Sequence, residues 1–356
     1  MIMVVLQADQ WRQITYALFM AAGATHTNAE CVAQSLVDAN LAGHDSHGVL
    51  RIPQYLQAIA AGQLNPASEP VVLKETACSL LIDGRWTFGQ VGARMCMQVA
   101  INRAKEYGMA IVALIRAYHV GRLGEYSEMA HDAGMIGLVT AGGFGRGGIG
   151  GMSPYGGAQP IFGMNPLSFG FPAGAQAPVV VDFATSTVAQ GKISVARARG
   201  EQLPPDCIID RNGKPTTDPE DYYNGGMALP FGGHKGYGLA VVTELLGQAL
   251  TGADTCGDAQ SSRGVYMLAG NVFIVLDPGL FRPKEEYSAA ADAVIQRIKA
   301  VPPAAGFSEV LLPGEPEQRS KVRRLQEGIG LPESSWETIR EQGIKYGLDP
   351  AELLSP

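Results

Sequence analysis

Apolar side chains in the first part of the chain recur at intervals of three and four positions, the pattern of helices with one buried face. Residues 8–42 contain two such segments, and Gly23 and Gly43 follow them, where helices commonly end. Thr27 and Glu30 have the spacing of a capping box, which predicts that the second helix begins there. The pattern therefore predicts two consecutive helices near the start of the chain.

The middle of the chain alternates short apolar runs with longer helical patterns. The runs MAIVALIRA, MIGLVTA, SFGFP, PVVVDFA and NVFIVLD have the length and composition of buried strands. QVGARMCMQVAINRAKEYG precedes the first run as a helix, and the nearly all-apolar GYGLAVVTELLGQALTG predicts a second, buried helix. Such alternation predicts a sheet that is covered by helices.

Residues 199–233 are rich in turn signals and include an Asn212-Gly213 pair of the kind found in hairpins. A stretch of this length without a regular apolar pattern is more typical of a functional loop than of a linker. From about residue 285 the pattern returns to an amphipathic helix, followed by the turn LLPGEPEQ and two more helical stretches.

Composition narrows the class of protein. The 356 residues suggest two domains, and 46% hydrophobic content with 45 glycines and 22 prolines predicts a compact, turn-rich α/β protein rather than disorder. A net charge of -7 without a Lys/Arg run argues against nucleic acid and membrane surfaces as partners. Five scattered cysteines without a CxxC pair, and no apolar stretch of about 18 residues, predict a soluble cytoplasmic protein.

The segment GGFGRGG places Gly143, Gly145 and Gly148 in the spacing of the dinucleotide fingerprint, directly after a predicted strand. A helix should follow, but the turn-forming SPYGG follows instead. The next acidic residue is Asp182, rather than one about 20 positions on. We interpret the segment as a flexible loop, so that a nicotinamide cofactor, if bound, would imply a fold other than Rossmann.

The segment HVGRLGEYSEMAHDAG places Gly121 and Gly124 around the first turn of a predicted helix. Backbone N–H groups there are open to an anion, and Arg122 adds positive charge. His119 stands just before this turn at the end of a predicted strand, where the sites of α/β proteins commonly lie. His119 is a candidate for chemistry, with a loop-capping role as the alternative.

Ionisable residues also stand at the ends of two apolar segments. Lys235, at the mouth of the predicted buried helix, is a candidate for binding a phosphate, a carboxylate or a ribose hydroxyl, or it pairs with a neighbouring acid. Asp182 ends the run VVVD and is either a hydrogen-bonding anchor or an acid with a raised pKa. Asn165-Pro166 is most simply a turn.

The segment GHDSHGVLRIPQYL holds two of the six histidines beside a proline. Pro53 is favoured in the first turn of a helix, so a helix is predicted to begin near Ile52 after a loop, HDSHG. A metal loop built from His44, Asp45 and His47 is the weaker interpretation, because no third strong ligand is obvious and both rings would lie in a glycine-flanked loop.

Around this bend, Ser46, His47, Arg51 and Tyr55 can converge on one small space. An adjacent hydroxyl and imidazole suit proton transfer near neutral pH, and an arginine fork suits a carboxylate. The segment therefore predicts a carboxylate site with a proton carrier, with loop polarity as the alternative.

Together these segments resemble the type-2 malate/L-lactate dehydrogenases, a family that includes ureidoglycolate and sulfolactate dehydrogenases and cyclic-imine carboxylate reductases. The matching pieces are LAGHDSHGVLRIPQYL, HVGRLG, FGMNPLSFGFP, VVVDFATS, IIDRNGKPTTDP, GGHKGYGLAVVTELLGQALTG and LLPGEPE. They occur in family order from about residue 10 to residue 350, and the chain looks most like the broad-specificity hydroxycarboxylate dehydrogenases. The departure is AGGFGRGGIGG at 141–151, where many relatives have an Asn, a small polar residue and a shorter loop.

The resemblance implies an α/β, non-Rossmann NAD(P)-binding fold of the malate/L-lactate dehydrogenase type 2 (sulfolactate dehydrogenase-like) family. It implies NAD or NADP as cofactor, a small-molecule carboxylate as substrate, and a homodimer with the active site near the subunit interface. We expect a mainly helical substrate and dimerisation domain at 1–118 plus 286–356, and a cofactor-binding domain at 119–285.

Residue by residue, the resemblance implies His47 as a proton donor or acceptor beside Ser46, with Arg51 and Tyr55 at the substrate. His119 matches the catalytic histidine of some members. Asp182 matches the proton donor of the imine reductases, which makes it a further catalytic candidate. The residues that match cofactor contacts are His47, Gly121, Arg122, Leu123, Val180, Val181, Asp182, Phe183, Ala184, His234, Lys235, Asn271, Gly314, Glu315, Pro316 and Glu317.

The resulting hypothesis is hydride transfer between nicotinamide C4 and C2 of a small 2-hydroxy or 2-oxo acid. The carboxylate docks on Arg51, and His47 or His119 moves the hydroxyl proton. The alternatives are reduction of a cyclic imine-2-carboxylate, a metal-dependent hydrolase or lyase built on His44, His47 and His119, and a metabolite-binding protein without catalysis. The choice between NAD and NADP, and the acid itself, stay open at this point.

Overall fold

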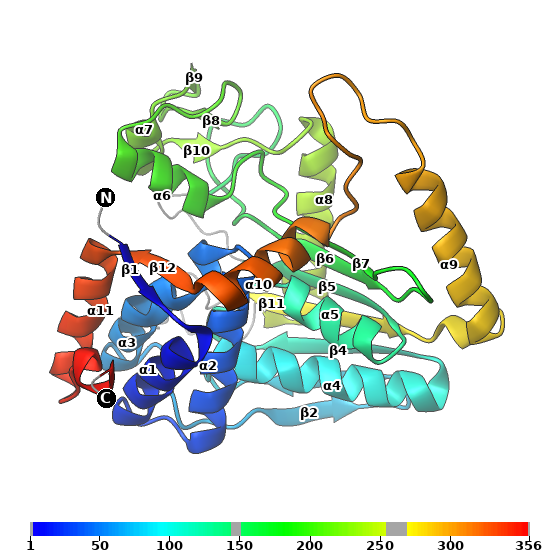
Figure 1. Ribbon diagram of the computed structural model, residues 1–356, viewed down its shortest axis with the longest axis horizontal. Helices are drawn as coiled ribbons and strands as arrows, with labels where there is room; N and C mark the ends of the chain where they lie inside the picture. The colour runs from blue at the N-terminus through cyan, green and yellow to red at the C-terminus, as the bar shows by residue number, and fades with distance from the viewer. Residues whose placement is uncertain (1–2, 144–150, 254–268, 355–356) are drawn as a thin grey trace.

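The computed structural model describes residues 3–143, 151–253 and 269–354 (Figure 1). At its centre lies a seven-stranded sheet with the order β2-β3-β4-β11-β5-β6-β7. The strands are β2 Val71–Glu75, β3 Ser79–Asp83, β4 Met109–Ile115, β5 Ile136–Gly142, β6 Leu167–Phe171, β7 Val179–Phe183 and β11 Gly270–Leu276. In this sheet β3 and β4 pair in parallel, and the other neighbours are antiparallel. A Rossmann sheet is mostly parallel, so the prediction of a non-Rossmann α/β fold is confirmed.

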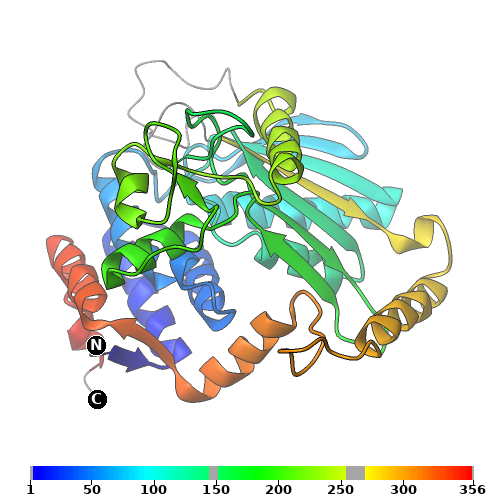
Figure 2. The same ribbon diagram turned by 90° about the horizontal axis from the view of Figure 1, so that it is seen from above.

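Helices cover both faces of the sheet (Figures 1 and 2). They are α4 Gly89–Tyr107, α5 Gly124–Asp132, and α8 His234–Glu244, which continues as the π-helical segment η3 Leu245–Leu250. Val139 and Ala141 of β5 share an apolar core with α4 and α5. Gly142 lies on the opposite face, where a side chain would meet the backbone of Thr243 in α8 at 2.1 Å. The predicted sheet between helices is thus confirmed.

A second core is built from helices taken from both ends of the described chain. They are α1 Ala8–Ala21, α2 His26–Leu41, α3 Ile52–Ala60 and α11 Glu333–Lys345. Trp11, Phe19, Tyr55 and Phe88 are buried in this core. A two-stranded antiparallel sheet, β1 Met3–Leu6 and β12 Ile329–Pro332, joins its earliest and latest parts. The sequence pattern did not indicate this pairing.

A third, smaller unit lies above the sheet in Figure 1 and contains the turn-rich segment. Its elements are α6 Gln190–Arg199, β8 Ile208–Ile209, β9 Pro215–Thr216, α7 Pro219–Tyr223 and β10 Met227–Ala228. The strands β8 and β9 pair around Asn212-Gly213, so the predicted hairpin is confirmed. Gly213 has a φ of +77°, and the Asp210 carboxylate accepts the backbone N–H groups of Asn212 and Lys214.

Two late helices complete the fold, α9 Lys284–Lys299 and α10 Glu315–Glu327. In Figure 1, α9 stands at the edge of the molecule beyond β7, whereas α10 crosses in front of the junction between the cores. Asp292 of α9 accepts three backbone N–H groups from residues 174–176, at 2.9, 2.7 and 3.1 Å. These bonds hold α9 against the connection between β6 and β7.

Three details differ from, or go beyond, the sequence prediction. Helix α2 is capped by Thr25, whose hydroxyl accepts the N–H of Asn28 at 3.2 Å, so the capping box at Thr27 and Glu30 is wrong. The helix predicted to be buried, α8, is covered by described residues on one side, while Val242 on it is 49% exposed. The expected domain division at residue 118 falls inside the connected sheet, because β4 pairs with β11 across it. The division itself stays a prediction.

In the described parts of the chain, the helices are too short or too polar to cross a bilayer.

We expect Thr25→Ala to lower the free energy of unfolding by about 1 kcal/mol, because the first turn of α2 loses its side-chain cap. Thr27→Ala is the matched control, since Thr27 is exposed inside the helix, and its effect should be much smaller. Urea denaturation of both variants measures the difference. Equal losses would contradict the assignment of the cap to Thr25.

Candidate active site

The bend before α3 is built as the proline predicts, and a buried asparagine adds to it. Helix α3 begins at Ile52 with Pro53 in its first turn, and the preceding residues form two short 3-10 turns instead of an irregular loop. Asn40 in α2 accepts the N–H of Val49 at 2.8 Å and donates to Asp45 at 2.6 Å. A side chain at Gly48 would lie 2.1 Å from the Asn40 oxygen, so only glycine fits this approach.

Two histidines face each other at this bend. The rings of His47 and His119 are stacked with centroids 5.6 Å apart and an angle of 20° between their planes. Nδ1 of His47 lies 3.0 Å from the Ser46 hydroxyl, and Nδ1 of His119 lies 2.8 Å from the Tyr55 hydroxyl. His47 comes from the bend and His119 from the segment after β4, so the site forms where the helical core meets the sheet.

Arg51 lies beside this pair. Its Nε donates to the backbone oxygen of Ser46 at 2.6 Å, and its Nη1 donates to Gln54 at 2.6 Å. These contacts fix the plane of the guanidinium group next to the imidazoles. The predicted convergence of Ser46, His47, Arg51 and Tyr55 is therefore present, and the structure adds His119 to it.

Burial and positive charge keep both histidines neutral. Burial, with Arg51, His44 and Arg122 adding to it, lowers the pKa of His47 to about 3. Burial is also the largest cause of the lowered pKa of His119, followed by Arg51 and His47. A neutral imidazole can accept a proton, whereas its charged form is unfavourable here until a negative group approaches.

A second polar cluster lies at the start of α5. Gly124 donates its N–H to Asp182 of β7 at 2.7 Å, and Arg122 donates to Glu128 at 2.6 Å. Burial raises the pKa of Asp182, while Arg122 and the bond from Gly124 oppose the rise. Asp182 is thus an anchored acid with a raised pKa, which combines the two readings that its sequence position left open.

Arg122 is the least satisfied group of this cluster. It is 5% exposed, and its Nε and Nη1 atoms find no hydrogen-bond partner among the described residues. Asn271, 3% exposed near the start of β11, likewise has a side-chain oxygen without a partner in the described part of the chain. Buried polar groups are normally bonded, so these atoms indicate where a bound molecule could supply partners.

His44 and Asp45 face away from the imidazole pair toward α10. Nε2 of His44 lies 3.3 Å from Glu317, and Asp45 accepts Arg324 at 2.5 and 3.0 Å. Nowhere in the described ranges do three His, Cys, Asp or Glu side chains cluster closely enough to hold a metal ion. The arrangement of these side chains therefore gives no support to the metal-dependent alternative.

The other predicted cofactor residues fall into two groups. Gly314 to Glu317 begin α10 beside β7, where Val180 N–H donates to the Pro313 oxygen at 3.2 Å. In contrast, His234 and Lys235 are exposed at the start of α8, so the cost of a buried lysine does not arise. Most of the predicted cofactor residues lie on segments around the second cluster or at the adjoining strand ends. They are Gly121 to Leu123, Val180 to Ala184, Asn271 and Gly314 to Glu317.

Sequence reasoning missed Gln90, Asn40 and Glu125. Gln90 is fully buried and donates to the Tyr55 hydroxyl at 2.8 Å. Glu125 in α5 accepts Ser35 of α2 at 2.7 Å and Arg94 of α4 at 2.5 Å, and so joins three helices. None of these residues belongs to a recognisable motif, and a polar residue at a helical core position was the one available signal.

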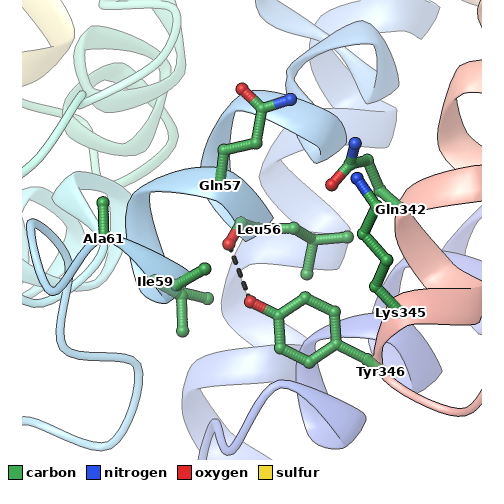
Figure 3. Close-up of a pocket in the computed structure, with 8 residues that line it drawn as sticks. Leu56, Gln57, Ile59, Ala61, Gln342, Lys345 and Tyr346 are labelled. Atoms are coloured by element: carbon green, nitrogen blue, oxygen red, sulfur yellow. Dashed lines mark hydrogen bonds between the residues drawn. The ribbon is translucent and has the colours of Figure 1, made fainter.

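A surface hollow between α3 and α11 lies apart from the histidines (Figure 3). It is lined by Leu56, Gln57, Ile59, Ala60, Ala61, Gln342, Lys345 and Tyr346. The Tyr346 hydroxyl donates to the Leu56 backbone oxygen at 2.8 Å. Among its lining side chains, Lys345 is basic and Tyr346 is weakly acidic, and the others carry no ionisable group. The hollow therefore lacks a pair of groups suited to acid–base chemistry, and we do not assign the chemistry to it.

The fold is that of an α/β protein in which a pair of stacked histidines lies where a helical core meets a mixed sheet. Residues 6–340 match the sequence profile of the malate/L-lactate dehydrogenases. The chain is 35% identical to L-sulfolactate dehydrogenase from Methanocaldococcus jannaschii, covering 97% of this chain and 98% of that one. It is 36% identical to hydroxycarboxylate dehydrogenase B from Escherichia coli K12, covering 95% and 93%. The protein therefore belongs to the malate/L-lactate dehydrogenase family.

Solved structures agree with this assignment. The sulfolactate dehydrogenase from M. jannaschii superimposes with a TM-score of 0.89 at 34% identity, covering 99% of this chain and 100% of that chain. A Δ1-piperideine-2-carboxylate reductase from Pseudomonas syringae gives 0.83 at 28% identity, covering 95% and 99%. The predicted family is confirmed, and the neighbours include both a hydroxy-acid dehydrogenase and an imine reductase.

The depressed pKa of His47 predicts a loss of stability in acid. A histidine with a pKa near 6.5 in the unfolded chain and about 3 in the folded chain binds its proton only on unfolding between these values. At pH 5.0 this favours the unfolded state by about 2 kcal/mol. We expect His47→Gln to reduce the stability lost between pH 7.5 and 5.0 by that amount, measured by urea denaturation. The same pH dependence in parent and variant would contradict a neutral His47.

Proposed function

We propose that this protein is an NAD(P)-dependent oxidoreductase that transfers a hydride between nicotinamide C4 and C2 of a small 2-hydroxy or 2-oxo carboxylic acid. The observation that carries the proposal is the pair of half-buried, neutral histidines stacked beside Arg51. Oxidation of an alcohol needs a base for the hydroxyl proton, and a carboxylic acid needs a cation for its anchor. Family membership supports the same reaction.

Substrate binding and proton transfer are coupled in this arrangement. Arg51 takes the substrate carboxylate, and the negative charge offsets part of the effect of Arg51 on the imidazoles. The pKa values of His47 and His119 then rise toward the working pH, because Arg51 contributes to the lowering at both rings. The bound acid thereby makes proton uptake by a histidine easier as the hydroxyl O–H bond breaks.

The second cluster fits a nicotinamide dinucleotide. The unpartnered Arg122 nitrogens and the Asn271 oxygen supply donors and an acceptor for its polar groups, and the start of α5 offers a positive helix end. Residues on β7 and at the start of α10, from Val180 to Ala184 and from Gly314 to Glu317, would line it. The dinucleotide supplies the hydride acceptor or donor, and this chain orients it and moves the proton.

Reduction of a cyclic imine-2-carboxylate is the second candidate. Asp182 favours it, because a half-buried acid with a raised pKa can keep a proton for the ring nitrogen. The structural similarity to the piperideine-carboxylate reductase points the same way. The two reactions share the carboxylate anchor and differ in the atom that receives the proton.

One panel of assays tests the proposal. Small 2-oxo acids, 2-hydroxy acids and Δ1-piperideine-2-carboxylate are each supplied with NAD(H) or NADP(H), and absorbance of the reduced cofactor is followed. We expect turnover of a 2-oxo and 2-hydroxy acid pair.

Arg51→Gln should raise KM by about tenfold or more, since a buried charged contact is lost. His47→Gln and His119→Gln should lower kcat by roughly a hundredfold or more. Wild-type turnover in both histidine variants would sink the mechanism, and turnover of the imine alone would favour the second candidate.

We also propose that the protein is a homodimer. Val242, Leu245 and Leu250 on α8 and η3 are 49%, 58% and 60% exposed, a large apolar face on a helix whose sequence suits a buried one. A second copy would cover it. Leu245→Glu should convert a dimer into a monomer in light scattering. Val322→Glu, 61% exposed on α10, is the control and should leave the mass unchanged. A parent protein with the mass of one chain would contradict the proposal.

A further inference from the structure

Gln90, Tyr55 and His119 form a chain of two hydrogen bonds inside the protein. Gln90 Nε2 donates to the Tyr55 oxygen at 2.8 Å, and that oxygen lies 2.8 Å from Nδ1 of His119. Gln90 and Tyr55 are both fully buried. Gln90 is the second residue of α4, Tyr55 lies in α3, and His119 follows β4, so the chain crosses three elements.

The donor at one end sets the direction of the whole chain. An amide N–H can only donate, so the Tyr55 oxygen accepts from Gln90. The phenol still has its one proton to donate, and Nδ1 of His119 is an acceptor within hydrogen-bond distance of it. An imidazole nitrogen that accepts a hydrogen bond carries no proton. In the neutral ring the proton must then be on Nε2.

We propose that Gln90 is a positioning residue that fixes the proton of His119 on Nε2 by acting through the Tyr55 hydroxyl. Burial keeps the pKa of His119 low, so the neutral ring, in which the two tautomers differ, is the form that matters. Gln90 lies outside the segments of this sequence that resemble family motifs. Tyr55, expected at the substrate, becomes the link between Gln90 and His119.

The orientation of one amide decides between two states. Gln90 Oε1 is buried and has no hydrogen-bond partner among the described residues. A half-turn of the amide would bring this oxygen to Tyr55 and reverse both bonds. Tyr55 would then donate to Gln90, and His119 would donate from Nδ1. The position of the His119 proton therefore depends on a side chain in another helix.

The consequence for the reaction rests on the proposed function. In reduction, Nε2–H of His119 is a hydrogen-bond donor for the oxygen of the 2-oxo group, and protonated His47 gives that oxygen its proton as the hydride reaches C2. In oxidation, Nε2 of His119 already holds a proton, so the hydroxyl proton goes to His47 while the hydride leaves C2 for the nicotinamide. The two histidines then have different tasks, although they stack on one another.

Nitrogen-15 NMR of the full-length protein with labelled histidine tests the tautomer without any ligand. His119→Gln identifies the His119 signals by their loss. In the parent protein we expect Nδ1 of His119 to give the signal of an unprotonated nitrogen and Nε2 that of a protonated one. A protonated Nδ1 in the parent protein would overturn the proposal.

Variants at position 90 test the cause. At a pH high enough to ionise the new carboxyl group, Gln90→Glu replaces the donor by a carboxylate that can only accept, so the His119 proton should move to Nδ1. At that pH the kcat for reduction should fall by at least about tenfold, with KM nearly unchanged. Gln90→Met removes the hydrogen-bond donor to Tyr55 and should give a mixture of the two His119 tautomers. This variant still tests the role of Gln90 if Gln90→Glu does not fold. Gln98→Glu, on the exposed side of the same helix, is the control.

Two outcomes separate this proposal from the proposed function. An unchanged His119 tautomer in both folded Gln90 variants would refute the role of Gln90, whatever the activity. The expected tautomer and its reversal in Gln90→Glu, without turnover of any acid in the panel, would support the role of Gln90 while the proposed function failed.

Discussion

The contact between the Tyr55 hydroxyl and His119 joins the two halves of the candidate site. The ring of Tyr55 is packed with Phe19 and Phe88 in the helical core, whereas His119 belongs to the segment that leaves β4. Each half is rigid for its own reason, Pro53 and Asn40 on one side and the sheet on the other. The stacked histidines therefore have a fixed geometry only when both cores are folded and docked against one another.

Charge is distributed to suit two different tasks. Around the histidines the nearby charges are the positive ones of Arg51 and Arg122, which disfavour the imidazolium ion. Around Arg122 itself lie the carboxylates of Glu128 and Asp182, so its positive charge is balanced although two of its nitrogens lack hydrogen-bond partners. The first region thus suits a negatively charged substrate, whereas the second contains an arginine that is paired with carboxylates and has two nitrogens without hydrogen-bond partners among the described residues. This difference supports separate places for acid and dinucleotide.

The sequence predicted those features of the fold that depend on residues close together in the chain. Pro53 indicated the start of α3, Asn212-Gly213 the hairpin, and the apolar runs five of the seven strands of the sheet, whereas β2 and β3 were not predicted. Pairings between distant residues were beyond reach, because β1 and β12 are too short to stand out and meet only through tertiary contacts. The apolar sequence of α8 suggested burial, yet among the described residues of this chain several apolar side chains of this helical region, such as Leu245 and Leu250, stay exposed. Gln90 was missed for a similar reason, since its partner lies 35 positions away.

The helical core has a consequence for synthesis of the chain on the ribosome. Trp11 donates to the backbone oxygen of Ile329, and the pairing of β1 with β12 spans the same separation of 318 residues or more. The strands and helices of the central sheet emerge from the ribosome before residue 329 and can assemble first. The core that α1 and α2 share with α11 can be completed only after α11 has been synthesised. The bend that holds His47 would take its final shape among the last events.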